Sequence, residues 1–82
     1  MVSAFVLVSV PAQKSGEVVE ALRQYPQVQE AAAVFGDVDV VAKVQARSFA
    51  DLDRLVMQVI QGKEIIKATR TYIIIESLHW QR

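Results

Sequence analysis

Two carboxylates one residue apart, Asp37 and Asp39, stand between apolar runs in the segment VFGDVDVVAK, residues 34–43. Carboxylates at this spacing can accept hydrogen bonds from a cationic group on a ligand. Asp37 has an ordinary structural explanation as well, because Asp is common in tight turns. Asp39 is harder to explain in that way, since Asp is depleted in strands and this residue opens an apolar strand. We therefore regard a role in function and solvation of the hairpin end as equally good explanations of Asp39.

A second polar set lies in ATRTYIII, residues 68–75, where Thr69 and Thr71 share one face of a predicted strand and offer hydroxyl donors. Thr is an ordinary strand former, so a structural role explains both equally well. Arg70 points to the other face, where we expect solvent or an ion-pair partner. No nucleophile and base stand at a recognisable spacing, and the chain has no Cys and one His. We therefore predict no catalytic residue, no metal and no cofactor.

Six short elements must position these residues. Runs rich in β-branched residues, bounded by Pro and Gly, predict strands over 3–10, 27–35, 38–47 and 67–76. We expect Ser15 to cap a helix that reaches Tyr25 and stops at Pro26. A second helix is expected from Ser48, with Asp51 three residues on, to Gly62, and its apolar face would comprise Leu52, Leu55, Val56, Val59 and Ile60.

The hairpin between the second and third strands is predicted to turn on Gly36-Asp37, a pair suited to a two-residue connection. The resulting βαββαβ order is the ferredoxin-like pattern, an α+β fold whose four-stranded antiparallel sheet carries both helices on one face. The first strand and residues 73–75 are apolar on both sides, so the open face of the sheet needs a cover. We predict a homodimer with sheet packed against sheet.

Length and composition agree with one small domain, residues 1–82, in which 52% of residues are hydrophobic. Nine basic residues balance nine acidic ones, so no global field draws the chain to nucleic acid or to an anionic membrane. The apolar start is half the length of a membrane helix and lacks the basic region of a secretion signal. We expect a mature, soluble, cytoplasmic chain.

The hairpin FGDVD (35–39), the last strand ATRTYIII (68–75) and the link YPQVQEAAAVFG (25–36) together resemble the effector-binding, or RAM, domain of Lrp/AsnC transcription regulators. The resemblance covers residues 3–76 and matches the family's two motifs, the first at Gly36, Asp37, Val38 and Asp39 and the second at Thr69, Arg70 and Thr71. It implies that the ligand is bound by Gly36, Asp37, Val38, Asp39, Thr69 and Thr71. Family regulators carry an N-terminal helix-turn-helix domain, whereas this chain begins at the first strand. We expect a stand-alone form that does not itself bind DNA.

The resemblance implies an oligomer of dimers that binds an amino acid or a similar small effector, and a full-length Lrp/AsnC regulator is a candidate partner. The function expected is regulation of transcription or amino-acid metabolism through ligand-dependent assembly or partner binding. Asp39 would accept the ligand's ammonium, Asp37 would chiefly shape the turn, and the threonine hydroxyls and the backbone N–H groups near Gly36 would donate to its carboxylate. The alternative is a small dimeric α+β oxygenase or isomerase, which needs few catalytic side chains.

Overall fold

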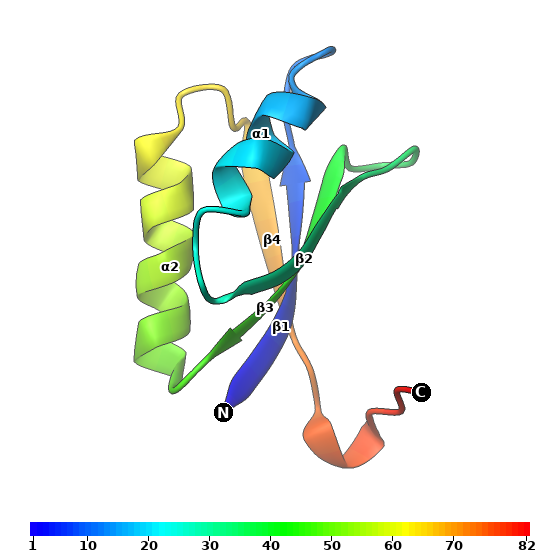
Figure 1. Ribbon diagram of the computed structural model, residues 1–82, viewed down its shortest axis with the longest axis vertical. Helices are drawn as coiled ribbons and strands as arrows, with labels where there is room; N and C mark the ends of the chain where they lie inside the picture. The colour runs from blue at the N-terminus through cyan, green and yellow to red at the C-terminus, as the bar shows by residue number, and fades with distance from the viewer.

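A four-stranded antiparallel sheet with the strand order β2-β3-β1-β4 forms one layer of the protein, and both helices cover one of its faces (Figure 1). The computed structural model describes the backbone of all 82 residues and the side chains of all but residues 60–62. Along the chain the elements are β1 (Val2–Ser9), α1 (Ser15–Leu22), β2 (Val28–Ala33), β3 (Val40–Ala46), α2 (Phe49–Gly62), β4 (Ala68–Ile73) and a short 3-10 helix, η1 (Glu76–Leu78). The predicted ferredoxin-like fold is confirmed.

The core lies between the sheet and the helices, because side chains alternate across the strands. In β1 the residues Ala4, Val6 and Val8 are buried, and they pair with Val44, Ala42 and Val40 of β3. The helices add the buried residues Val18, Leu22, Leu52, Leu55 and Val59. The predicted apolar face of α2 is thereby confirmed for its described members, with Val56 partly buried, while Ile60 lies outside the described side chains.

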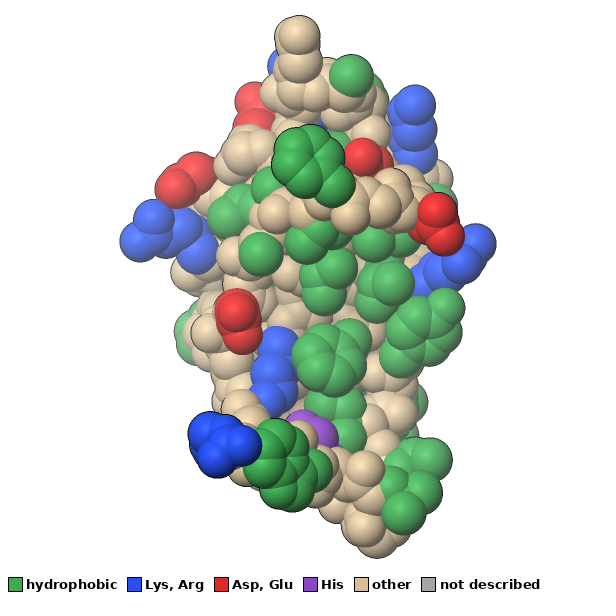
Figure 2. Space-filling model, turned by 90° about the vertical axis from the view of Figure 1, so that its right-hand side faces the viewer, with side chains coloured by type: hydrophobic (Ala, Val, Ile, Leu, Met, Phe, Trp, Pro, Cys, Tyr) green, Lys and Arg blue, Asp and Glu red, His purple; other side chains and the backbone are tan. Residues whose placement is uncertain are grey.

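The opposite face of the sheet, called here the open face, carries Phe5 and Leu7 of β1, Val41 of β3, and Arg70 and Tyr72 of β4. Phe5 lies opposite Tyr72, and Leu7 lies opposite Arg70 on one side and Val41 on the other. Phe5 is 39% exposed and Tyr72 53% exposed. Hydrophobic side chains gather over the middle of this side of the molecule (Figure 2). The first strand thus has apolar residues on both faces, as its sequence predicted.

The ends of the helices differ in part from the prediction. Ser48 does cap α2, since its Oγ accepts a hydrogen bond from the Asp51 N–H at 3.1 Å. Ser15 does not cap α1: it is the first helical residue, and Lys14 occupies the N-cap position without a side-chain hydrogen bond. The helix α1 ends at Leu22, short of the predicted Tyr25, because the N–H of Tyr25 turns to the carbonyl of Leu22. As far as the structure describes them, neither helix is long and apolar enough to cross a membrane.

The hairpin between β2 and β3 is also longer than predicted. The strands pair antiparallel as far as Ala33 and Val40, and the Val34 N–H donates to the Asp39 carbonyl at 3.0 Å. A loop of four residues, 35–38, therefore replaces the two-residue turn on Gly36-Asp37. Gly36 has a φ of 158°, a value that residues with a side chain rarely adopt, and this value lies far from the roughly +60° that a two-residue type I′ turn requires. The extra length lets the loop extend toward β1.

Candidate functional site

The hairpin loop is anchored to the end of β1 by Asp39. The Asp39 N–H donates to the Val8 carbonyl at 2.9 Å, and the Asp39 carboxylate accepts a hydrogen bond from the Val10 N–H through Oδ2 at 2.9 Å. The second bond is partly buried and joins residues 29 positions apart. Asp39 therefore holds the loop against the strand on which the core depends.

The anchored loop forms one wall of a pocket of about 250 Å³. We call it the hairpin pocket, and it is lined by Leu7, Ser9, Asp37, Val38, Ala68, Thr69 and Arg70. These residues come from the loop, from the end of β1 and from the start of β4, which is β1's neighbour in the sheet. The loop and β4 are far apart in the sequence, so the fold alone creates this site.

Two opposite charges share the hairpin pocket. Asp37 lies in the loop, and Arg70 lies on β4, where it is exposed and sits opposite Leu7 of β1. Within the described part of the chain, Asp37 and Arg70 are not within ion-pairing distance of each other. Apolar surface from Leu7, Val38 and Ala68 lines the pocket as well. A pocket of this kind can take a small molecule that carries both charges and some apolar surface.

A model of the Lrp/AsnC ligand-binding domain matches residues 3–80 of the chain. The chain belongs to the Lrp/AsnC ligand-binding domain family. One curated relative, the HTH-type transcriptional regulator FL11 of Pyrococcus furiosus, is 30% identical over 73 residues, which are 89% of this chain and 48% of the relative. The chain thus spans about half the length of the curated relatives that it matches.

Solved structures of similar length share the fold of this Lrp/AsnC domain. The hypothetical protein PHS023 from Pyrococcus horikoshii is 39% identical, with a TM-score of 0.85 over 92% of this chain and 90% of that one. The protein TTHA0845 from Thermus thermophilus is 32% identical, with a TM-score of 0.87 over the full length of both chains. Isolated domains of this size and fold therefore exist among solved structures.

The six site residues predicted in the Lrp/AsnC domain fall into two groups. Asp37, Val38 and Thr69 line the hairpin pocket. Gly36 lies in the exposed part of the loop, beside the fully exposed Phe35. Asp39 makes the anchoring bonds to β1, whereas Asp37 lies at the pocket wall. The ligand contacts expected of the two acids stay predictions.

The two threonines lie on the face of β4 that the helices cover. Thr69 pairs with Val8 and Thr71 pairs with Val6, both of which are buried in the core. Strand alternation therefore directs the threonine side chains away from the open face, and the backbone of Thr69 is the part that can reach the hairpin pocket. Thr71 does not line the pocket.

Arg70 lines the hairpin pocket, although from the sequence we expected it in solvent or in an ion pair and not among the site residues. The same alternation that turns Thr69 and Thr71 toward the helices turns Arg70 toward the open face, where the hairpin pocket lies. The signal was present in the sequence, since a lone Arg between two half-buried threonines must point outward. What the sequence could not supply was the position of the loop opposite it. Among the described residues, no set of three His, Cys, Asp or Glu is arranged to hold a metal ion.

Proposed function

We propose that this domain senses an amino acid, which it binds in the hairpin pocket, and that ligand binding regulates transcription or amino-acid metabolism through assembly or through a partner. The observation that carries the proposal is the presence of Asp37 and Arg70 in one pocket with apolar surface. An α-amino acid carries an ammonium, a carboxylate and a side chain, and each needs a matching group once water is removed.

Arg70 is assigned to the ligand's carboxylate, because a guanidinium can donate two parallel hydrogen bonds to it. Asp37 is assigned to the ammonium, and Leu7 and Val38 to the ligand's side chain. The backbone of Thr69 provides further polar contacts. Gly36 and Asp39 shape and anchor the loop in this proposal, and Thr71 has no contact with the ligand.

Dimerisation is part of the proposal, because the open face leaves Phe5, Leu7 and Tyr72 in contact with water. A second copy packed sheet against sheet would cover these side chains. The hairpin pocket borders the same face, so a neighbouring subunit would also close the pocket over the ligand and strengthen its charged contacts by excluding water. Ligand occupancy and assembly would then favour each other.

Relatives support the regulatory role without fixing the ligand. The matched P. furiosus protein is described as an HTH-type transcriptional regulator, and this chain matches 48% of its length. The transcriptional regulator NMB0573 of Neisseria meningitidis, which shares the fold at 17% identity, has been solved in complex with L-Met. A full-length regulator of the family is a reasonable partner for this domain, since like domains pair through like faces.

A thermal-shift screen of the twenty amino acids tests the proposal. A ligand that binds only the folded assembly at 100 times its Kd stabilises it by about 2.7 kcal/mol, and each kcal/mol raises the melting temperature of a domain of this size by about 4–8 °C. We expect one amino acid, or a small group with related side chains, to raise the melting temperature. If none of the twenty does so at millimolar concentration, amino-acid sensing is wrong.

The same sample separates a sensor from the oxygenase or isomerase alternative. The stabilising amino acid is incubated with the protein overnight and then recovered by chromatography. A sensor returns it unchanged, and we expect this outcome because no nucleophile and base stand at a recognisable spacing in the sequence. Product formation that depends on the protein would favour the enzyme.

A further inference from the structure

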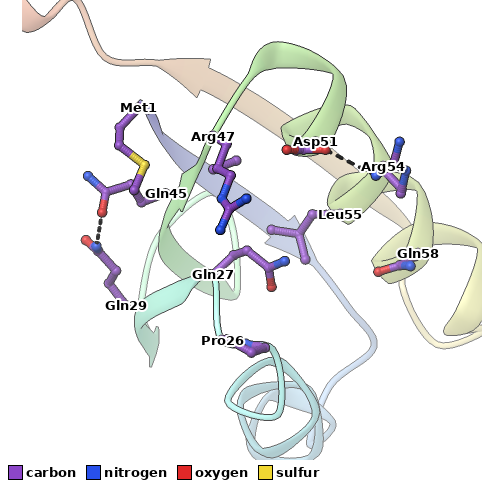
Figure 3. Close-up of a pocket in the computed structure, with 11 residues that line it drawn as sticks. Met1, Pro26, Gln27, Gln29, Gln45, Arg47, Asp51, Arg54, Leu55 and Gln58 are labelled. Atoms are coloured by element: carbon purple, nitrogen blue, oxygen red, sulfur yellow. Dashed lines mark hydrogen bonds and ion pairs between the residues drawn. The ribbon is translucent and has the colours of Figure 1, made fainter.

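A second cleft, of about 530 Å³, lies at the other end of the sheet from the hairpin pocket. We call it the glutamine cleft after its polar lining of Gln27, Gln29, Gln45, Gln58, Arg47 and Arg54. It lies where β2 begins, β3 ends and α2 begins (Figure 3). Val2 pairs with Ala46 at this end of β1 and Val8 pairs with Val40 at the other, so about 20 Å of strand separates the two sites.

Part of the cleft is already organised by its own hydrogen bonds. The Gln29 Nε2 donates to the Gln45 Oε1 at 2.7 Å, and the Gln45 Nε2 donates to the Ser3 Oγ at 3.4 Å. These two linked hydrogen bonds fix which amide atoms of Gln29 and Gln45 remain free along one wall of the glutamine cleft. Each carboxamide has four hydrogen-bonding positions, so both Gln29 and Gln45 retain capacity for a ligand.

The charges of the cleft leave one cation free. Asp51 is engaged by Arg54, whose Nη1 lies 3.1 Å from the Asp51 Oδ1. Arg47 is exposed, and no ion pair holds it among the described side chains. Its side chain reaches into the middle of the cleft, between the Gln29–Gln45 pair and Leu55, with its end toward Gln27 (Figure 3). Counted over the side chains alone, Arg47, Arg54 and Asp51 give the cleft one net positive charge, and Arg47 presents it to solvent.

We propose that the glutamine cleft binds a small carboxylate that carries a second hydrogen-bonding group. Arg47 holds the carboxylate through its guanidinium fork. The carboxamides of Gln27 and Gln58 bind the polar remainder, and Leu55 packs against the ligand's carbon chain. A volume of about 530 Å³ lies within the roughly 300–1,000 Å³ range of small-molecule sites.

This ligand class differs from that of the hairpin pocket. The glutamine cleft has no free carboxylate for an ammonium, since Asp51 is paired with Arg54. In the hairpin pocket a ligand without an ammonium would leave the Asp37 carboxylate unmatched, so it should prefer the glutamine cleft. The proposal also stands apart from amino-acid sensing, because the two sites share no lining residue.

Isothermal titration calorimetry with glutarate tests the proposal, because glutarate has two carboxylates and no ammonium. We expect saturable binding to the full chain in buffer of constant ionic strength, with a Kd in the millimolar range. Glutaramide, which has the same carbon chain without charge, should bind at least fivefold more weakly. Sodium sulfate in place of glutarate should give no saturable heat, since a general attraction for anions would not need the cleft's amides.

Three variants locate the binding. Arg47→Gln should raise the Kd for glutarate at least fivefold. The matched control is Arg23→Gln, which removes an exposed arginine paired with Glu20 on α1, and it should leave the Kd unchanged. Asp37→Asn should also leave it unchanged, even though it alters the hairpin pocket. Equal binding of glutaramide, saturable sulfate binding of equal strength, or an unaltered Kd in Arg47→Gln would overturn the proposal.

Discussion

The carboxylate of Asp39 accepts a hydrogen bond from the backbone N–H of Val10 at 2.9 Å and so joins the hairpin loop to the end of β1. Hydrogen bonds to a charged group contribute about 1.5–3 kcal/mol. Asp39→Ala should therefore lower the free energy of unfolding by about that amount, because the Val10 N–H loses its acceptor in a partly buried place. Urea denaturation measures the difference.

The matched control for Asp39 is Asp53→Ala, which removes an exposed acid on α2. It should change the free energy of unfolding by less than about 0.5 kcal/mol, as surface substitutions ordinarily do. Equal stability of Asp39→Ala and Asp53→Ala would mean that the anchoring bond contributes nothing in solution.

Asp37 is predicted to act on the ligand rather than on stability. Asp37→Asn keeps the turn propensity and removes the charge that faces the ligand's ammonium. We expect the affinity for the amino acid found in the screen to fall at least about tenfold, the equivalent of about 1.4 kcal/mol, with little change in unfolding. Calorimetry with Asp53→Asn as the control checks this. An unchanged affinity would remove Asp37 from the site.

Thr71, unlike Asp37, is predicted not to contact the ligand. Thr71 pairs with Val6 on the face beneath the helices, so Thr71→Val should leave ligand affinity within about twofold, because the two side chains have the same shape and branching. The family resemblance on its own implies a contact with the ligand, and on that interpretation the loss of the hydroxyl would weaken binding. Calorimetry on this variant therefore decides whether the strand register or the family motif identifies the ligand-binding residues correctly.

Phe5 and Tyr72 form an exposed aromatic pair on the open face. Replacing Phe5 tests whether a second subunit covers that face. Phe5→Glu puts a carboxylate between Tyr72 of β4 and Lys43 of β3 on that face. A covering subunit would have to bury this charge, and the desolvation cost can exceed what an ion pair with Lys43 returns. Light scattering should report at least a dimer for the wild type and a smaller species for Phe5→Glu. Phe49→Glu changes another exposed phenylalanine, 62% exposed on α2, and should keep the wild-type mass. A monomeric wild type would refute the assembly.

The sequence was sufficient for the fold because each element has a strong local signal. Alternation in β1 and helical spacing in α2 depend on residues close together in the chain, and the βαββαβ element order places β1 between β3 and β4. Helix ends were less predictable. Ser15 has the chemistry of a cap, but the turn before α1 leaves it inside the helix, and local composition does not distinguish these positions.

The site was less predictable because long-range contacts build it. Gly36-Asp37 is typical of a two-residue turn, yet the bonds from Asp39 to Val8 and Val10 favour a longer loop. Nothing near Asp39 in the sequence reveals those partners. Once the loop lies beside β4, Asp37 and Arg70 share a pocket, and the variable position between the two motif threonines provides the positive charge.

Amino-acid binding in the hairpin pocket depends most on Arg70 as the group that binds the ligand's carboxylate. The direct measurement is calorimetry of the amino acid found in the screen and of its α-carboxamide, on the wild type and on Arg70→Gln, with Arg23→Gln as the control. We predict that the wild type and the control bind the acid at least about tenfold more tightly than the amide, and that Arg70→Gln binds both equally weakly. Equal affinity of the wild type for acid and amide, or a preserved preference in Arg70→Gln, would contradict the account.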